Sequence, residues 1–333
     1  MVAEGGRDPF TLPLLLRFPA LAWVPRVRLG SFPTPVLEAR LPDGRPLWIK
    51  RDDRSGAPLG GNKVRSLEFL LAGVRSGEEI VTTGARGSTH ALATALYGTA
   101  LGGRVTVVRW PQEMNPDAER VEAAIRRTAT ETRDRRTIPG ALFDAAVLRL
   151  VRHARWVPPG GTSPRGALGH VNAALELAEQ VAAGRLPAPA RIVVPLGSGG
   201  TAAGLALGLA IAGLDSTVVG ITVAPRLVAN RRRVLSVASR TARFIERSAG
   251  VRVPRVNPAR VVVDHEQYGG AYGRATEAGK GAARWLEITT GIPVDATYSA
   301  KALAAVLSPV PAGRPGGDGP TLFWLTFDAR AVL

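Results

Sequence analysis

The chain has 333 residues, of which 45% are hydrophobic and 21% are charged, a composition typical of a globular protein long enough to form two domains. It has no cysteine, which excludes disulfides, thiolate metal sites and cysteine nucleophiles. The net charge of +16 comes mostly from arginines spread along the chain, with one dense run at residues 231–233, and no RNA-binding or zinc motif accompanies it. A solvated basic surface is therefore favoured over a nucleic-acid-binding one, and neither a nucleic acid nor a metal is expected as a partner.

The apolar segments are too short to cross a membrane. The longest candidate, residues 201–214, is rich in Ala and Gly and falls short of the roughly 20 residues that a membrane helix needs. The N-terminus lacks a basic region followed by a long apolar one, so no signal peptide is expected. These observations predict a cytoplasmic protein without a membrane partner.

Strand and helix signals alternate in the first part of the chain. The expected elements are a strand at 46–50, a helix from near Lys63 that Asn62 can cap, a strand at 79–83, a turn at 84–88, a helix at 89–100 and a strand at 103–108. Residues 112–137 are charged and are predicted to be helical. This alternation is typical of a doubly wound α/β domain.

The alternation resumes after a turn-rich segment at 158–164, where the chain could cross between domains. The expected elements are a helix at 166–183, a strand at 191–195, a helix at about 201–212, a strand at 218–223, a helix around 275–289, a short helix from 301 and a last strand at 321–326. Residues 226–260 are rich in arginine and have no clear assignment.

Chemistry that needs a primary amine must use Lys50, Lys63, Lys280 or Lys301, the only lysines of the chain. Lys63 ends the segment Gly-Gly-Asn-Lys at the expected start of a helix. An amine forms an imine with an aldehyde only when it is uncharged, and both the positive end of a helix and burial lower the pKa of a lysine. Paired glycines also let the backbone approach a bound ring closely. From this segment alone, an ordinary surface lysine near a helix start explains the pattern equally well.

A glycine-rich loop lies between the strand at 191–195 and the helix at 201–212. Free backbone N–H groups at a helix start bind phosphate, glycine leaves room for the oxygens, and hydroxyl groups add donors. The loop is neither a nucleotide P-loop nor a dinucleotide fingerprint. Phosphate binding is favoured over a tight turn that needs glycine only for packing. The candidate residues are Gly197, Ser198, Gly199, Gly200 and Thr201.

A second group of candidates stands at the start of the Ala-rich helix at 89–100. A hydroxyl of Ser88 or Thr89 could bind a substrate carboxylate together with helix N–H groups, or pass a proton, although an N-cap is the commoner role of a serine at this place. His90 is interpreted as a packed histidine rather than a base, because no carboxylate partner is evident.

Tyrosines near the C-terminus form a third group. Tyr298 could act as an acid or base over a ring, and Ser299 could face a ring nitrogen, but a tyrosine that merely ends a strand explains the segment equally well. Tyr272 lies in a glycine-containing loop that could close over a pocket.

Taken in order, these segments resemble the fold-type II pyridoxal-5′-phosphate (PLP) enzymes, and most of all the branch that contains D-cysteine desulfhydrase and 1-aminocyclopropane-1-carboxylate (ACC) deaminase. That branch has the segments Lys-Arg-Asp-Asp, Gly-Gly-Asn-Lys, Ser-Asn-His, Gly-Ser-x-Gly-Thr and Asp-Pro-x-Tyr-x-x-Lys. Their counterparts here are residues 50–53, 60–63, 88–90, 197–201 and 295–301. The resemblance covers about residues 17–330 and implies an α/β fold of two doubly wound three-layer α/β/α domains. Residues 1–58 and 165–333 would form a large cofactor-binding domain, and residues 59–164 a small substrate-gating domain.

The resemblance also implies roles for single residues. Lys63 would hold PLP as an imine and move the α-proton of the substrate, and Ser88 would contact the substrate carboxylate or transfer a proton. Tyr272 and Tyr298 would flank the substrate, and Ser299 would face the pyridine nitrogen. The implied cofactor-binding residues are Lys63, Asn62, Thr89, Gly197, Ser198, Gly199, Gly200, Thr201, Ser299 and Thr326.

Several positions depart from the pattern of the branch. Thr89 stands where an Asn usually meets the ring hydroxyl, Arg86 lies where a Gln is usual, and Ala296 replaces a Pro. Phe327 and Asp328 replace two glycines, which predicts a bulkier wall and an acidic group in the pocket. Arg86 could recruit a second acid of a substrate, but a surface arginine is favoured.

The resemblance implies a homodimeric PLP-dependent lyase or deaminase of a small amino acid, releasing ammonia and a 2-oxo acid. A β-replacement enzyme or racemase on the same scaffold is an alternative. Another is a degenerate homologue that binds PLP without turnover, which the departures at Thr89, Phe327 and Asp328 motivate.

Overall fold

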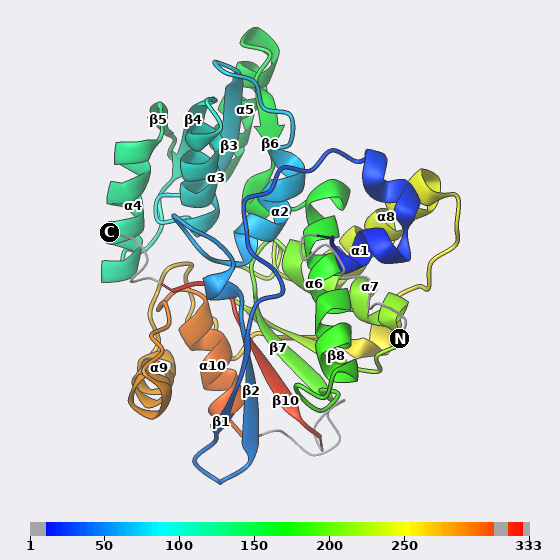
Figure 1. Ribbon diagram of the computed structural model, residues 1–333. Helices are drawn as coiled ribbons and strands as arrows, with labels where there is room; N and C mark the ends of the chain where they lie inside the picture. The colour runs from blue at the N-terminus through cyan, green and yellow to red at the C-terminus, as the bar shows by residue number, and fades with distance from the viewer. Residues whose placement is uncertain (1–10, 310–318, 329–333) are drawn as a thin grey trace.

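The computed structural model describes residues 11–309 and 319–328 and contains two β-sheets (Figure 1). The larger sheet has the strand order β1-β2-β10-β7-β8-β9, in which β1 is antiparallel to β2 and the other neighbours are parallel. Its strands are β1 (Val36–Arg40), β2 (Pro46–Arg51), β10 (Thr321–Leu325), β7 (Arg191–Leu196), β8 (Thr217–Thr222) and β9 (Val261–Asp264). The first and last parts of the chain therefore meet in one sheet.

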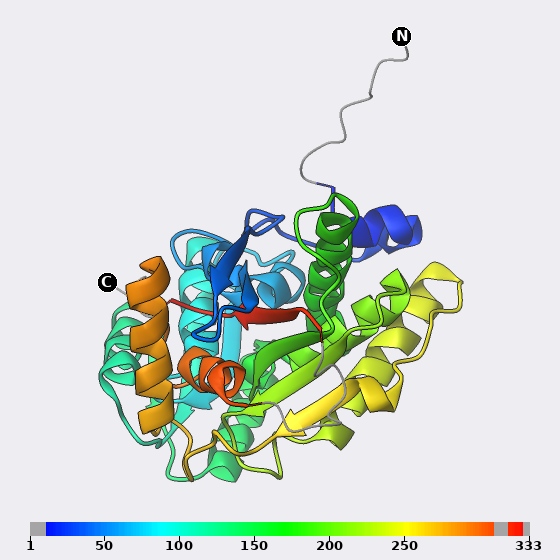
Figure 2. The same ribbon diagram turned by 90° about the horizontal axis from the view of Figure 1, so that it is seen from below.

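Helices cover both faces of the larger sheet, because successive side chains of a strand point to opposite faces. In β7, Ile192 and Val194 pack in one core with helices α6, α7 and α8, whereas Val193 packs in another with α9 and α10. Figure 2 shows the sheet between these two layers of helices. The helices are α6 (Pro164–Ala182), α7 (Gly200–Ala212), α8 (Arg231–Ala249), α9 (Glu277–Thr290) and α10 (Ser299–Leu307).

The smaller sheet is parallel throughout, with the order β5-β4-β3-β6. Ile80 of β3 packs with α2, α3 and α4 on one face, and the adjacent Val81 packs with α5 on the other. The elements are α2 (Asn62–Leu70), β3 (Glu79–Ala85), α3 (Thr89–Ala100), β4 (Arg104–Trp110), α4 (Pro116–Thr128), β5 (Glu131–Asp134), α5 (Ile138–Val151) and β6 (Arg155–Val157). Both sheets are thus the middle layer of a three-layer arrangement, as the resemblance implies.

A short N-terminal helix and several single turns complete the described chain. Helix α1 (Pro13–Arg17) is tied to α6 because the N–H of Leu14 donates to Oδ1 of Asn172 at 3.0 Å. The 3₁₀ segments are η1 (Pro19–Trp23), η2 (Asp52–Arg54), η3 (Pro159–Gly161) and η4 (Pro258–Arg260).

Most predicted elements are confirmed, but three predictions are wrong or incomplete. Residues 112–137 are not one helical segment, since α4 is followed by the edge strand β5. The unassigned segment at 226–260 contains the long helix α8. Asn62 does not cap α2: it is the first helical residue, Gly61 is the N-cap residue, and no side chain caps that helix. The predicted domain boundaries at 58/59 and 164/165 stay predictions.

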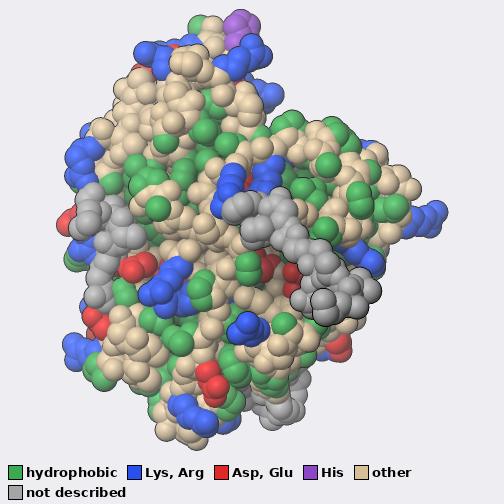
Figure 3. Space-filling model, in the orientation of Figure 1, with side chains coloured by type: hydrophobic (Ala, Val, Ile, Leu, Met, Phe, Trp, Pro, Cys, Tyr) green, Lys and Arg blue, Asp and Glu red, His purple; other side chains and the backbone are tan. Residues whose placement is uncertain are grey.

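The surface in Figure 3 carries its Lys and Arg side chains at separate places on the face shown rather than in one continuous patch.

Among the described residues, no helix combines the length and the apolar character that a membrane crossing requires. Within the same ranges, no group of three His, Asp or Glu side chains is arranged to hold a metal ion. Residues 1–10, to which the signal-peptide expectation applies, lie outside the described residues.

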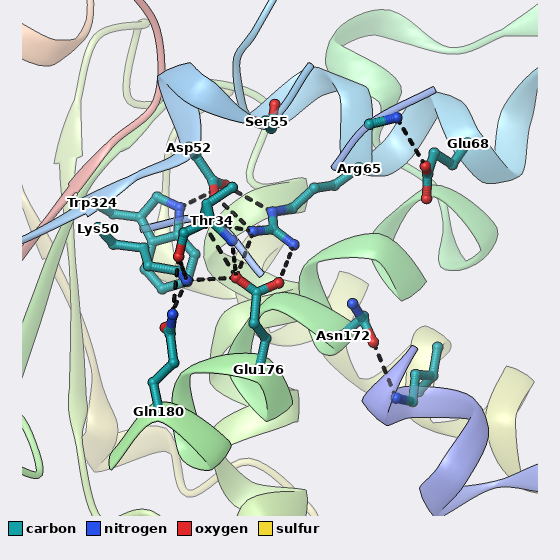
Figure 4. A network of polar contacts seen from close by, with 12 residues as sticks. Thr34, Lys50, Asp52, Ser55, Arg65, Glu68, Asn172, Glu176, Gln180 and Trp324 are labelled. Carbon is teal, nitrogen blue, oxygen red and sulfur yellow. Dashed lines mark hydrogen bonds and ion pairs between the residues drawn. The ribbon is translucent and has the colours of Figure 1, made fainter. Parts of the chain in front are cut away.

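A buried ionic network fixes α2 against the larger sheet and α6 (Figure 4). Arg65 of α2 binds Asp52 at 2.7 Å and Glu176 of α6 at 2.9 Å, and Nζ of Lys50 from β2 lies 2.5 Å from Glu176. Burial alone would raise the pKa of Asp52 and Glu176, but Arg65 and Lys50 lower both, so the carboxylates stay charged. Trp324, Thr34 and Gln180 supply further hydrogen bonds to this set.

Candidate active site

A cavity of about 740 Å³ lies where residues from both sheets meet. The ends of β3 and β7 contribute to its wall, as do the starts of α2, α3 and α7, which lie far apart in the sequence. Parallel strands expose their carboxyl ends at one edge of a sheet, and ligands of α/β proteins bind there. The predicted site residues that line the cavity are Asn62, Lys63, Ser88, Thr89, Gly197, Ser198, Gly199, Gly200, Thr201, Tyr272, Tyr298 and Thr326.

Lys63 is the second residue of α2 and lines the cavity. Its Nζ lies 3.4 Å from the carbonyl oxygen of Gly160, and no carboxylate of the described residues forms an ion pair with it. Burial lowers the pKa of Lys63 from 10.5 to about 8. The uncharged amine is therefore accessible near neutral pH, as nucleophilic chemistry at a carbonyl requires.

Replacing Lys63 with methionine is expected to stabilise the cofactor-free protein at pH 7. The unfolded chain holds the Lys63 proton up to a pKa of 10.5 and the folded chain only up to about 8, so the unfolding free energy of the parent rises with pH between these values. The advantage of the methionine variant should be complete below pH 8 and absent above pH 10.5. Denaturant unfolding of both proteins at these pH values measures it, with the exposed Lys280→Met as the control. If the methionine variant were more stable than the parent by the same amount below pH 8 and above pH 10.5, the lowered pKa of Lys63 would not be the cause.

The loop of residues 197–201 joins β7 to α7 and ends at an open helix start. Gly199 is in the left-handed region with a φ of 93°, and no side chain caps α7. The N–H groups of the first turn of a helix lack partners within the helix, so they can bind an anion. A Cβ on Gly200 would lie 2.8 Å from Oγ1 of Thr162, and one on Gly160 would lie 2.1 Å from Oγ of Ser198. A side chain at either place would therefore displace one of these hydroxyls, and Gly160 in addition has a positive φ of 66° that favours glycine.

A chain of hydrogen bonds ties the lysine helix to the glycine-rich loop. Nδ2 of Asn62 donates to Oγ1 of Thr201 at 2.8 Å, and Nε2 of His170 lies 3.3 Å from the same hydroxyl and 3.0 Å from Oγ of Ser66. Burial, together with Lys63 nearby, lowers the pKa of His170 well below 6.5, so the ring stays uncharged. His170 is a site residue that the sequence does not predict, because nothing in the segment around it indicates that it faces Thr201, 31 residues later.

The start of α3 supplies the second predicted group. Ser88 is the N-cap residue, and its Oγ accepts the N–H of Ala91 at 3.3 Å, which confirms the capping interpretation. Nε2 of His90 lies 3.2 Å from Oγ1 of Thr82, and burial beside Lys63 lowers the pKa of His90 to about 3. His90 is therefore a packed, uncharged histidine.

The two tyrosines meet at the cavity wall. The hydroxyls of Tyr272 and Tyr298 are hydrogen-bonded, and their rings are edge to face with centroids 6.0 Å apart. Burial raises the pKa of Tyr298 to about 12, so its proton is retained at neutral pH. Asp295 holds the segment in place by accepting the N–H groups of Tyr298 at 2.6 Å and Ser299 at 3.0 Å.

Ser299 and Asp328 lie elsewhere than expected, whereas Phe327 and Arg86 agree with the expectation. Ser299 is fully buried and does not line the cavity; its Oγ lies 3.3 Å from Oγ1 of Thr326, which does. Phe327 lines the cavity and makes the predicted bulkier wall, but Asp328 does not, so the predicted acidic group is absent from the described lining. Arg86 also lies off the cavity, with Nε 3.7 Å from Asp134, in agreement with a surface arginine.

The family model for pyridoxal-phosphate dependent enzymes matches residues 27–326. The chain belongs to that family. It is 32% identical over 323 residues to the D-cysteine desulfhydrases of Salmonella choleraesuis (strain SC-B67) and Klebsiella pneumoniae, and each match covers 93% of this chain and 95% of the relative. Among solved structures, it is similar to an ACC deaminase homologue with a TM-score of 0.76, 29% identity and 95% coverage of both chains. The threonine deaminase isoform 2 of tomato (Solanum lycopersicum) has the same fold. Its TM-score is 0.60 at 14% identity, and the match covers 95% of this chain and 83% of the other.

The cavity residues suit a phosphate-bearing aldehyde. An unpaired amine with a lowered pKa and an uncapped helix start without side-chain bulk line the same cavity. Oγ1 of Thr83 is buried there without a hydrogen-bond partner among the described residues. Since buried polar atoms are normally satisfied, this hydroxyl is available to a polar ligand. The donor set therefore fits the cofactor of the family.

Proposed function

We propose that the chain is a PLP-dependent lyase or deaminase of a small amino acid of the D-cysteine or ACC kind, which releases ammonia and a 2-oxo acid. The observation that carries the proposal is Lys63, an amine with a lowered pKa in a cavity that also contains the open start of α7. The similarity to D-cysteine desulfhydrases and to an ACC deaminase homologue supports this reaction class.

PLP supplies an aldehyde that reacts with amines and a ring that accepts the electron pair left at the α carbon of an amino acid. We assign the attachment to Lys63 and the phosphate to the loop of residues 197–201. Asn62, Thr89 and Thr326 complete the proposed set at the cavity wall. Ser299 belongs to it through its contact with Thr326 rather than through the wall.

The remaining residues bind the substrate and move protons. Ser88 and the N–H groups at the start of α3 would hold the carboxylate, because the positive end of a helix favours an anion. Nζ of Lys63 would take the α-proton, since its lowered pKa makes the uncharged form available. Tyr298, which retains its proton with a pKa of about 12, and its partner Tyr272 would supply a proton to the departing group.

Product analysis with D- and L-cysteine and with ACC tests the proposal. One of these substrates should yield a 2-oxo acid and ammonia in equal amounts, with sulfide in addition from cysteine. A racemised or β-substituted amino acid without 2-oxo acid would instead support the alternative enzyme class. Bound PLP, visible in the absorption spectrum, without turnover of any amino acid would support a degenerate homologue.

Two further parts of the proposal come from the resemblance alone. The chain would form a homodimer, and residues 59–164 would move as a small domain that closes over the cavity. Light scattering of the purified protein measures the first.

A further inference from the structure

The run of three arginines at residues 231–233 forms the first turn of helix α8. Asn230 is the N-cap residue, and its Oδ1 accepts the N–H of Arg233 at 2.9 Å. Cations are unfavourable at the N-terminus of a helix, because the helix dipole is positive there. Three of them in one turn therefore call for a compensating interaction.

The three side chains differ in what they contact. Arg231 donates through Nε to the carbonyl oxygen of Pro258 at 3.1 Å, away from the cavity lining. Arg232 is exposed, as Arg231 and Arg233 also are, but it does not line the cavity. Arg233 lines the cavity, and its Nε donates to the carbonyl oxygen of Ser198 at 2.9 Å. A Cβ placed on Gly199 would lie 3.9 Å from Cγ of Arg233, so the aliphatic part of the Arg233 side chain packs against the glycine-rich loop.

The charge of Arg233 has no counter-ion in the described part of the chain. No described carboxylate forms an ion pair with it, and the only hydrogen bond of its side chain to a described residue is the one from Nε to Ser198. Its two terminal nitrogens therefore keep their donors. The loop beneath it is the open start of α7, which also presents donors and a positive dipole. Two positive groups side by side at a cavity wall match a doubly charged anion.

We propose that Arg233 is a binding residue for the phosphate of the cofactor, and that it acts from α8 across the loop whose amides hold the same group. The inference rests on the proposed cofactor site. A planar guanidinium forms paired, charge-assisted hydrogen bonds with phosphate, which a neutral hydroxyl or amide cannot match. The hydrogen bond to Ser198 fixes the side chain in advance, so little further ordering is needed on binding.

The test compares PLP with pyridoxal, which has the same aldehyde and ring but no phosphate. Each compound is titrated into four cofactor-free proteins, and binding is followed by absorbance. The proteins are the parent, Arg233→Ala, Arg233→Lys and the matched control Arg232→Ala. Loss of a charge-assisted hydrogen bond should weaken PLP binding by about 10- to 100-fold in Arg233→Ala and less in Arg233→Lys. Pyridoxal affinity should stay unchanged, and Arg232→Ala should match the parent with both compounds. Inorganic phosphate should compete with PLP more weakly in Arg233→Ala than in the parent.

Equal PLP affinity in Arg233→Ala and Arg232→Ala would overturn the inference while leaving the proposed function intact. An equal loss for PLP and pyridoxal would overturn it too, because Arg233 would then only keep the loop in shape through Ser198. If the parent binds neither compound, the cofactor site and this inference fail together. Circular dichroism melting of each variant shows that the compared proteins are folded.

Discussion

The Lys63→Ala variant is expected to lose turnover by at least about 10⁴-fold, because general base catalysis alone contributes roughly 10²–10⁴-fold and covalent attachment of the cofactor is lost as well. No other lysine is placed to replace it. Lys50 is held by Glu176 in the buried network, and Lys280 is exposed and paired with Glu277. Burial also lowers the pKa of Lys301 to about 8, but its Nζ donates to the carbonyl oxygen of Tyr268 at 2.7 Å and it does not line the cavity.

The measurement is kcat for the best substrate from the product analysis, with Lys280→Ala as the control that should match the parent. Borohydride reduction of the parent in the presence of PLP, followed by peptide mass analysis, should place the label on Lys63. A label on Lys301, or an active Lys63→Ala variant, would refute the assignment. Lys301 has the same lowered pKa of about 8 as Lys63. A label on Lys63 alone would therefore show that reactivity depends on the position in the cavity and not on the pKa.

The Glu176→Gln variant is expected to lower the free energy of unfolding by about 3–5 kcal/mol, the range observed when one partner of a buried ion pair is removed. Glu176 accepts from Arg65 and Lys50, whose side chains are almost completely buried. Its removal leaves two cations with only the carboxylate of Asp52 near them. The neutral amide of glutamine cannot compensate them.

Urea unfolding of the parent and the variant measures the difference, and Glu277→Gln, which breaks the exposed pair with Lys280, is the matched control. That control should change stability by no more than about 1 kcal/mol. Because salt screens buried charges weakly, the loss in Glu176→Gln should persist at about 1 M salt. A loss below about 1 kcal/mol, or one that disappears in salt, would show that the network does not stabilise the fold as argued.

The sequence predicted elements best where a local pattern also described their tertiary surroundings. Strand β7 is buried on both faces, so its continuous apolar run marked it, and α3 was bounded by its capping serine. Strand β5 has the sequence Glu-Thr-Arg-Asp and pairs with β4 through its backbone at the edge of the sheet, so no alternation of apolar side chains indicated it. Helix α8 was missed for a different reason. Its arginines hid an apolar stripe whose spacing is helical, with Val234, Val237, Ala238, Thr241, Ala242 and Ile245 buried.

The sequence by itself determined the family, the α/β architecture and the two local motifs at Lys63 and at residues 197–201, because each motif is contiguous and its chemistry depends on neighbours in the chain. Only the tertiary structure decided what surrounds them. Asn62 became a link to Thr201 rather than a helix cap, Ser299 was placed behind Thr326, and Arg233 came to lie over Ser198. These contacts join residues 27 to 139 positions apart, and the one between Asn62 and Thr201 forms only where helices that cover the two different sheets meet. Local spacing carries no information about such contacts, since packing of the two cores sets them.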